Sequence, residues 1–359
     1  MDHQKYRQIL EKTIVPAGLS PEETASRYKE VNDYIESFLP RKLYRFRRCN
    51  ERNIDAFYYD KLWFSSGIMM NDDYDARLYY DRGQLQTWLD SLRTSDGVLR
   101  VLGDIFSHNG LPSEMEQMIP GITTFIDSLK LLPKENIIKI SELLVHMLAE
   151  NMDNELKRNT EWVQRMSKFA CFSERIDSAM MWGQYSDCST GFAVEYDIRD
   201  SITTYDIPEE PTLKIWTKLM PVSYSKRRMD GTDYSKYLFQ IRVLRTIAQI
   251  RGMVIPELIE YIMVPCPDEF MTTKLAIAKS DEWKNEKEWR MFYISESRTE
   301  GICNYSYVIQ KPSAVYLGRK ISDINRKIIV DIARDKEIPI YHMELNDSDN
   351  RYKLRIIKR

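Results

Sequence analysis

The segment from Trp283 to Ile294, WKNEKEWRMFYI, carries two glutamates two positions apart where a charged run passes into an aromatic and aliphatic one. Side chains two apart share a face of a β-strand, whereas on an α-helix they point about 200° apart. On a strand, Glu286, Glu288 and Arg290 face the same way, and both carboxylates can converge on a ligand. On a continued helix, Lys284 and Glu288 form an i,i+4 pair on a solvated face. The strand-forming residues that follow favour the first arrangement.

Other polar and aromatic side chains that can take part in chemistry lie on short predicted elements. The alternating stretch KLYRFR places Arg45 and Arg47 on one strand face, either as ligand-binding groups or as an exposed face. Serines end two further predicted strands, at Ser65 in LWFSS and at Ser173 in ACFS.

Several familiar signatures are missing: a phosphate-binding Gly-Lys-Ser/Thr loop, a G-x-G-x-x-G turn, an H-E-x-x-H pair and a nucleophile elbow. Their absence argues against P-loop ATPases, dinucleotide-fold dehydrogenases, zinc proteases and α/β-hydrolases. The five cysteines stand singly, without a C-x-x-C pair or a metal-type grouping with the four histidines. We therefore expect reduced thiols in a cytoplasmic protein and no metal site.

The charge balance and hydropathy exclude further classes. The chain of 359 residues has 52 Lys and Arg against 54 Asp and Glu, so its formal net charge of −2 offers no global attraction to nucleic acid or anionic membrane. The N-terminal residues lack the apolar core of a signal peptide, and no apolar run approaches the roughly 18 residues of a membrane span. We expect a soluble protein with no membrane partner.

The elements that must position these side chains mix helices and strands without a regular β-α-β rhythm. A helix is predicted after Ser20, a typical N-cap, with Pro21 in its first turn and Pro40 after its end. Alternating or aromatic runs predict strands at 42–47, at the start of 61–75, and at 168–174, 189–198, 219–225, 288–294 and 313–318, followed by two closing strands at 338–345 and 352–359. The mixture predicts an α+β fold with a central mixed or antiparallel sheet and surrounding helices.

A block with apolar spacing of three and four interrupts the strand-bearing regions. It has no cluster of catalytic residue types, and we interpret it as a large helical insertion that contacts a protein partner or forms a lid. The predicted organisation is an N-terminal helical segment at 1–41, a discontinuous α/β core at 42–75 and 166–318, the insertion at 76–165, and a C-terminal helix with closing strands at 319–359.

Five segments occur in an order that resembles a known family: LYRFR, LWFSS with the acidic tail NDDYD, CFSE, MMWGQYSDCSTGFAVEYD and KSDEWKNEKEWR. They closely resemble the landmarks of domain-of-unknown-function family 2971, a bacterial family whose last motif reads K-x-x-x-W-x-x-E-x-E-W-R. The resemblance spans Leu43 to Gly318. Asp73 departs from it, because family members usually have a proline there, after the equivalents of Asn71 and Asp72.

The order of Arg, Ser and Glu-x-Glu is similar to the arrangement in ADP-ribosyltransferases, which cleave the nicotinamide glycosidic bond of NAD and pass ADP-ribose to an acceptor. The resemblance implies that Arg45 or Arg47 grips the pyrophosphate or the nicotinamide ribose, in a cleft shared with Glu288. A serine would position the ribose. Chain order favours Ser173 for this role, whereas the motif around Ser65 looks more like the transferase motif in isolation.

The same resemblance assigns the carboxylates. Glu288 would be the catalytic residue that stabilises the oxocarbenium-like transition state, and Glu286 would face the acceptor. The rings of Trp182 or Tyr185 would hold the nicotinamide, with packing under the sheet as the alternative. NAD is then the expected substrate, and the implied role is that of a bacterial toxin or antiphage defence effector.

Two other hypotheses stay open. On the same scaffold, Arg45, Arg47 and Glu288 can form a structural polar network in a catalytically silent binding or sensor module. Alternatively, the acids at 72, 75, 286 and 288 can surround magnesium in a nuclease. The acceptor of ADP-ribose, whether protein, nucleic acid or small molecule, also stays open.

Overall fold

The computed structural model describes residues 1–92, 124, 133–199, 202–207, 210–250, 264–294, 305–309 and 311–358. Its α-helices in these ranges are α1 (His3–Lys12), α2 (Pro21–Phe38), α3 (Glu51–Tyr58), α4 (Arg82–Ser91), α8 (Lys134–Met166), α9 (Ala179–Tyr185), α10 (Thr232–Ile250), α12 (Met271–Ile277) and α13 (Asp323–Asp335). Two short 3₁₀ turns are η1 (Gly67–Met69) and η2 (Asp281–Glu286).

The strands are β1 (Lys42–Arg47), β2 (Lys61–Ser66), β3 (Ser167–Ser173), β4 (Phe192–Asp197), β5 (Ile202–Ile207), β6 (Glu210–Pro221), β7 (Ser223–Ser225), β8 (Ala278–Ser280), β9 (Glu288–Ile294), β10 (Tyr305–Ile309), β11 (Ala314–Leu317), β12 (Ile340–Glu344) and β13 (Arg355–Lys358). Eleven of them form one sheet, and β7 and β8 form a separate parallel pair. Within the large sheet β11 and β12 pair in parallel and the other pairs are antiparallel. The predicted α+β class with a mixed central sheet is confirmed.

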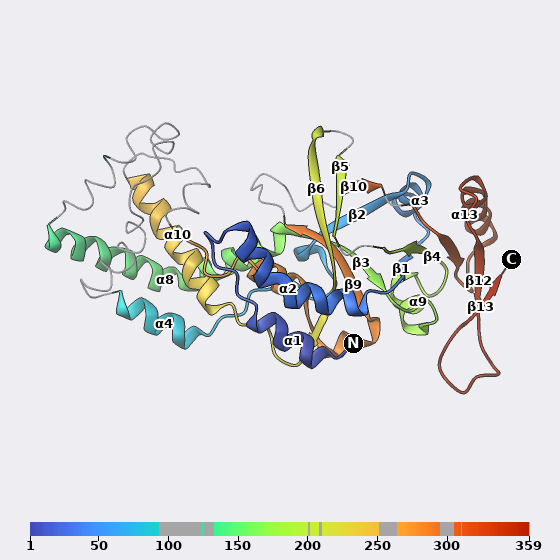
Figure 1. Ribbon diagram of the computed structural model, residues 1–359, viewed down its shortest axis with the longest axis horizontal. Helices are drawn as coiled ribbons and strands as arrows, with labels where there is room; N and C mark the ends of the chain where they lie inside the picture. Colours follow the sequence, from blue (N-terminus) through green and yellow to red (C-terminus); the bar gives the residue numbers. More distant parts are fainter. Residues whose placement is uncertain are drawn as a thin grey trace.

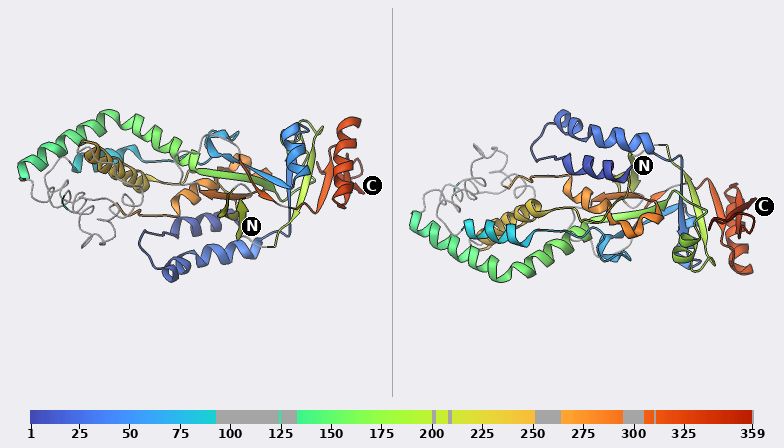
Figure 2. Two further views of the ribbon diagram at one scale, coloured as in Figure 1. Left: turned by 90° about the horizontal axis from the view of Figure 1, so that it is seen from above. Right: turned by 90° about the horizontal axis from the view of Figure 1, so that it is seen from below.

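The molecule is elongated, with the sheet between two end regions (Figure 1). Helices α4, α8 and α10 lie together at one end, and α13 with β12 and β13 lies at the other. In Figure 2, α1 and α2 lie side by side along one side of the central strands, and α1 contacts β7. None of the helices in the described ranges combines the length and apolar composition needed to cross a bilayer.

The path of the main sheet runs β13-β12-β11-β4-β1-β3-β9-β6-β5, and it branches at β3. One end of β3 pairs with β1, where Tyr44 lies opposite Ser173, and the other end pairs with β2, where Ser65 lies opposite Phe169. On its other edge β3 pairs along its whole length with β9, and Ser173 lies opposite Glu288. Because paired residues share a face, this register decides which side chains meet.

Local sequence explains the elements that carry the site. Ser20 is the N-cap of α2, as expected from the sequence, and the structure adds a full capping box with Glu23. Gly191 precedes β4 at a close approach of two backbones, and a Cβ there would lie 2.0 Å from the carbonyl oxygen of Arg47. Position 191 therefore requires glycine if β1 and β4 are to pair at this end.

In the block at 76–165, the described residues from Arg82 on are mostly helical, in α4 and α8, whereas residues 76–81 are not, and residues 93–123 and 125–132 lie outside the described residues. Helix α10, which follows the second group of core strands, packs against both of these helices. The helical end of the molecule is therefore built from two separate parts of the chain. The stretch PDEFMTTKLAIAKSDEW, at 267–283, predicts one continuous helix opened by Pro267, and this prediction is wrong, because β8 interrupts the helix by pairing with β7.

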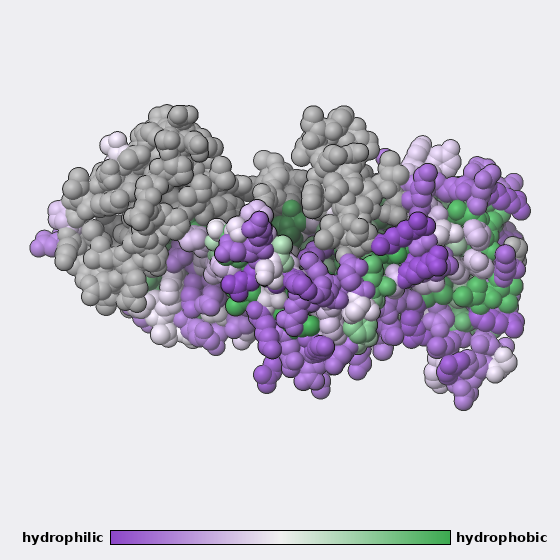
Figure 3. Space-filling view, in the orientation of Figure 1, coloured by the Kyte–Doolittle hydropathy of each residue, from purple (hydrophilic) through white to green (hydrophobic). Residues whose placement is uncertain are grey.

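On the face shown in Figure 3, the described surface is mostly hydrophilic, with hydrophobic residues gathered toward the C-terminal end. The exposed isoleucines of α13 and β13 belong to this end: Ile324, Ile328 and Ile356.

Candidate functional site

The two glutamates of the E-x-E pair meet at one lysine. Glu288 opens β9, as the strand interpretation predicted, but Glu286 ends the 3₁₀ turn η2 and is not on the strand. Lys287 between them has a left-handed backbone with φ of 45°. This turn lets both carboxylates approach the ammonium of Lys279, at 2.7 Å from Glu286 Oε2 and 3.1 Å from Glu288 Oε2.

Arg290 binds Glu288 from the other side. Its Nε donates to Glu288 Oε1 at 2.8 Å and its Nη2 to Oε2 at 3.2 Å, so both carboxylate oxygens are engaged. The same Nη2 donates to Asp75 Oδ1 at 2.7 Å, and Nη1 donates to the carbonyl oxygen of Ala276 at 2.7 Å. The guanidinium lies 4.9 Å from the ring centroid of Phe169. Arg290 thereby connects β9 to the end of α12 and to the loop that precedes α4.

We call Asp75, Lys279, Glu286, Glu288 and Arg290 the buried charge cluster. Arg290 and Asp75 have 0% side-chain exposure and Lys279 has 1%. Three carboxylates face two cations, so the fully ionised cluster carries one surplus negative charge. Burying such a surplus is costly, and it is relieved if one carboxyl retains its proton.

The pKa shifts indicate which carboxyl groups of the cluster keep their negative charge most firmly. Burial alone raises the pKa of Glu288, but the charges of Arg290 and Lys279 outweigh burial and hold the pKa well below its usual range. Burial raises the pKa of Glu286 in spite of Lys279, and it raises the pKa of Asp75 in spite of Arg290. Glu288 therefore holds its negative charge most firmly, and Glu286 and Asp75 are the carboxyls that are easier to protonate.

A small cavity, here called the glutamate pocket, lies against the cluster. Its volume is about 70 Å³, and its polar lining includes Tyr44, Asn71, Ser173, Tyr185, Glu286 and Glu288. The hydroxyl of Tyr185 donates to Glu286 Oε1 at 2.5 Å and accepts from the side-chain amide of Asn71 at 3.1 Å. Small-molecule sites usually have volumes of about 300–1,000 Å³, so this pocket holds at most a small group in the present conformation.

The serines expected at a ribose differ in position. Ser173 lines the glutamate pocket, but its hydroxyl already donates to the carbonyl oxygen of Glu286 at 2.6 Å and accepts from the backbone amide of Arg175 at 3.1 Å. These bonds fix the turn that carries the glutamate pair. Ser65 lies opposite Phe169 on the other branch of the sheet and does not line the pocket.

The structure does not bring Arg45 and Arg47 to a cleft with Glu288, and that expectation is wrong. Tyr44, Ser173 and Glu288 share one face through their register, and alternation places both arginines of β1 on the opposite face. There Arg45 donates to the carbonyl oxygen of Trp63 at 2.7 Å, and Arg47 donates to Asn53 Oδ1 at 3.4 Å.

The aromatic pair on α9 divides between core and pocket. Trp182 is fully buried, donates from Nε1 to the carbonyl oxygen of Ile176 at 2.7 Å and packs edge-on to Phe46 at 5.1 Å. No face of its ring is open to a ligand. Tyr185 extends to the glutamate pocket, where burial and the charge of Glu286 raise the pKa of its hydroxyl well above the usual value.

Sequence reasoning missed two members of the site. Lys279 is the first residue of the motif K-x-x-x-W-x-x-E-x-E-W-R, but we assigned it no role, because it lies on β8, a strand of three residues inside a stretch with helical spacing. Asp75 was considered only as a metal ligand. Within the described ranges, no group of three or more His, Cys, Asp and Glu side chains is arranged to hold a metal ion. Asp72 instead uses Oδ1 to accept from the backbone amide of Tyr74 at 2.9 Å.

A second cavity, here called the basic pocket, has a volume of about 350 Å³. It lies between the loop before α4, the end of β7 with the residues after it, and β8. Its charged and aromatic lining comprises Tyr74, Arg77, Tyr79, Lys226, Arg227, Arg228 and Lys279. Among the residues that the structure describes, Lys279 alone lines both this cavity and the glutamate pocket.

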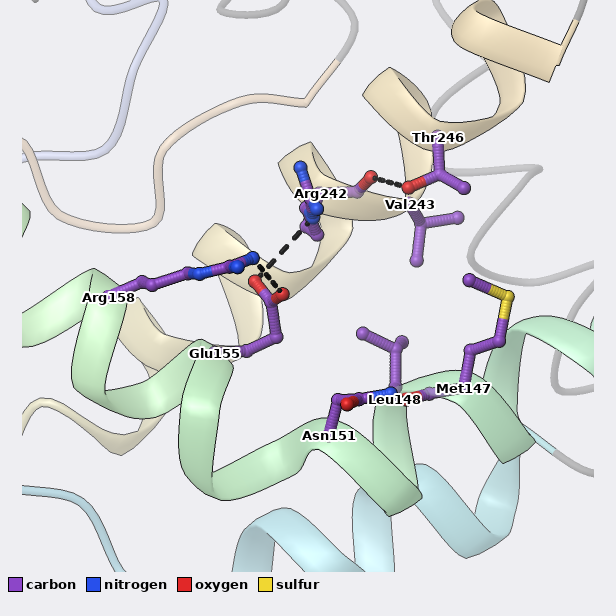
Figure 4. Close-up of a pocket in the computed structure, with 8 residues that line it drawn as sticks. All are labelled: Met147, Leu148, Asn151, Glu155, Arg158, Arg242, Val243 and Thr246. Carbon is purple, nitrogen blue, oxygen red and sulfur yellow. Dashed lines mark hydrogen bonds and ion pairs between the residues drawn. The ribbon is translucent and has the colours of Figure 1, made fainter.

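A third cavity, of about 200 Å³, lies between α8 and α10. Figure 4 shows Glu155 of α8 between two arginines, and its carboxylate lies 2.9 Å from Arg158 and 3.5 Å from Arg242. The remaining lining is largely aliphatic, including Leu148 and Val243. This ion-paired contact between helices has no group positioned for chemistry.

The comparisons with known proteins give one match. The family model described as "Protein of unknown function (DUF2971)" matches residues 181–291. That range contains every member of the buried charge cluster except Asp75, together with Tyr185. The match supports the resemblance found in the sequence motifs, over a shorter part of the chain. No curated protein and no solved structure matches the chain.

Proposed function

We propose that this chain is a catalytically silent binding or sensor module in which the E-x-E pair is structural. The observation that carries the proposal is the saturation of Glu288. Its two oxygens accept three bonds from Arg290 and Lys279, and its side chain is 6% exposed. A carboxylate that stabilises an oxocarbenium ion must instead form a hydrogen bond to the ribose. To do so, Glu288 would have to give up charge-assisted bonds to Arg290 that are worth about 1.5–3 kcal/mol each.

Two further features support a structural role. The glutamate pocket has about 70 Å³, far less than a dinucleotide requires, and the arginines expected to grip NAD lie on the other face of the sheet. The cluster also connects β8, β9, the end of α12 and the loop at Asp75. The basic pocket is lined by β8 and α12, and the glutamate pocket by β8 and β9, so the cluster holds the walls of the two cavities in place.

NAD-dependent ADP-ribosyl transfer is the second candidate, and one observation favours it. Glu286 and Glu288 lie side by side with Ser173, Tyr44 and Tyr185 in a single pocket. Carboxylate, hydroxyl and aromatic groups together suit a nicotinamide riboside. For this activity the pocket would have to widen and Glu288 would have to exchange a bond to Arg290 for one to the ribose.

Nicotinamide release and thermal stability, measured on the same purified proteins, separate the two candidates. The proteins are the wild type, Glu288→Gln and the exposed control Glu282→Gln, incubated with NAD. A structural role predicts no release above the protein-free background, and a melting temperature that falls for Glu288→Gln but not for Glu282→Gln. Release by the wild type that drops roughly a hundredfold in Glu288→Gln, with unchanged melting temperature, would refute the binding-module proposal in favour of the transferase.

A further inference from the structure

We propose that the basic pocket binds a small ligand that carries a pyrophosphate group, of the nucleoside di- or triphosphate class. The site is separate from the glutamate pocket, and the proposal holds whether or not Glu288 is catalytic. Its basis is the charge, the shape and the aromatic lining of the cavity.

Most of the positive charge in the basic pocket is not paired with a carboxylate of any described residue. Five cationic side chains line the cavity, from Arg77, Lys226, Arg227, Arg228 and Lys279, and no Asp or Glu is among its described lining residues. Arg77, Lys226 and Arg227 are exposed and make no ion pair with any residue in the described ranges. Lys279, also in the wall, is already paired with the glutamates behind it. Concentrated positive charge in a concave site attracts a ligand with several negative charges.

Arg228 is held in place before any ligand arrives. Its Nη2 donates to the carbonyl oxygens of Arg77 and Leu78, both at 2.9 Å, and its guanidinium lies 5.2 Å from the ring centroid of Tyr74 and 5.5 Å from that of Tyr79. Burial and the neighbouring charge of Arg77 lower the pKa of Arg228. A bound phosphate would offset both effects, and the fixed loop reduces the entropy that binding would cost.

The shape selects the ligand class. A volume of about 350 Å³ falls within the range of small-molecule sites, about 300–1,000 Å³, and exceeds the needs of a single phosphate. Arginine side chains bind phosphate oxygens with two parallel donors, which suits adjacent phosphate groups. Tyr74 and Tyr79 are 59% and 38% exposed, so aromatic surface is available to a nucleoside at the rim.

Calorimetric titration of the full chain tests the site, with ADP and inorganic pyrophosphate as probes. We expect both to bind, and the dissociation constant for each to rise at least tenfold in Arg77→Ala and in Arg227→Ala. Both arginines are exposed, so neither variant should unfold, and melting temperature verifies this. The control Arg27→Ala removes an exposed arginine on α2, outside the pocket, and should leave both constants unchanged.

The aromatic contact has its own variant. Tyr79→Ala should weaken ADP binding several-fold more than pyrophosphate binding, because pyrophosphate has no ring to contact. Equal affinity for ADP and pyrophosphate in the wild type would overturn the nucleotide assignment. If neither ADP nor pyrophosphate binds at 1 mM, where the binding free energy is roughly −4 kcal/mol, the site is overturned. It is also overturned if the arginine variants bind both probes as tightly as the wild type does. Tighter, Arg227-dependent binding of a single-stranded oligonucleotide would assign the surface to nucleic acid and overturn the small-ligand proposal.

Discussion

Replacing Arg290 by lysine tests whether the buried charge cluster depends on the guanidinium fork or only on its charge. Arg290 makes four hydrogen bonds from three nitrogen atoms, three of them to the carboxylates of Glu288 and Asp75. A lysine ammonium keeps the positive charge but is a single point on a flexible stem. It cannot hold both oxygens of Glu288, Asp75 Oδ1 and the carbonyl of Ala276 together.

The expected loss follows from these contacts. Lysine forfeits at least two charge-assisted bonds at about 1.5–3 kcal/mol each, and the groups left behind are buried. Removing one partner of a buried ion pair costs about 3–5 kcal/mol, which gives a similar figure. We therefore expect Arg290→Lys to lower the free energy of unfolding by about 3 kcal/mol or more, and the melting temperature by about 5 °C or more.

Urea denaturation followed by tryptophan fluorescence measures the change, beside a matched Arg158→Lys control. Arg158 makes one bond to Glu155 at 2.9 Å and its side chain is 64% exposed, so its replacement should change stability by less than about 0.5 kcal/mol. If Arg290→Lys shifts the urea midpoint no more than Arg158→Lys does, the cluster needs only a cation, and the argument from fork geometry is wrong.

Three further substitutions test the electrostatics and packing. Burial raises the folded-state pKa of Glu286, so its ionisation destabilises the wild type as pH rises above the ordinary value of about 4.5. The melting temperature of Glu286→Gln should therefore gain on that of the wild type as pH rises from there. Burial lowers the pKa of Lys218 to about 8, so its charge destabilises the folded protein at pH 7. Lys218→Met should therefore stabilise the protein by about 1–2 kcal/mol at pH 7. In calorimetric scans this gain should shrink as pH rises above 8, because the wild-type lysine then loses its charge. Gly191→Ala should cost about 3 kcal/mol or more in a denaturant titration, because its Cβ would lie 2.0 Å from a backbone oxygen, whereas alanine at exposed Gly183 meets nothing within 4 Å.

Local signals predicted most of the elements because those signals act within the element. The capping box at Ser20 and Glu23 and the alternation in KLYRFR each depend on neighbours a few residues away. The short strand β8 has no such signal. Its three residues extend only because β7, more than fifty positions earlier, pairs with them in parallel. For the same reason, the family motif that begins at Lys279 did not reveal that its side chain meets the two glutamates.

The position of Arg45 and Arg47 relative to the glutamates depends on the register between neighbouring strands, which the sequence of one strand does not reveal. Alternation correctly separated Tyr44 from Arg45 on β1, and Glu288 from Trp289 on β9. It could not say which face of β1 joins which face of β9, because that depends on the register of β3 between them. The pairs of Tyr44 with Ser173 and of Ser173 with Glu288 settle the matter, and a shift of one residue would have brought the arginines to the glutamates.

The carboxylates of Glu286 and Glu288 converge as their spacing predicted, but not as neighbours on one strand. Glu286 was expected to meet Glu288 as a strand neighbour, but it precedes the strand and turns back through the left-handed Lys287. What draws the two carboxylates together is the ammonium of Lys279, and what keeps Glu288 from a ligand is the guanidinium of Arg290. Two buried glutamates need cations to neutralise them, and the bonds to these cations decide whether the carboxylates are free to react. Since Lys279 also lines the basic pocket, its pairing with the glutamates leaves the exposed arginines of that pocket as the groups available to an anion.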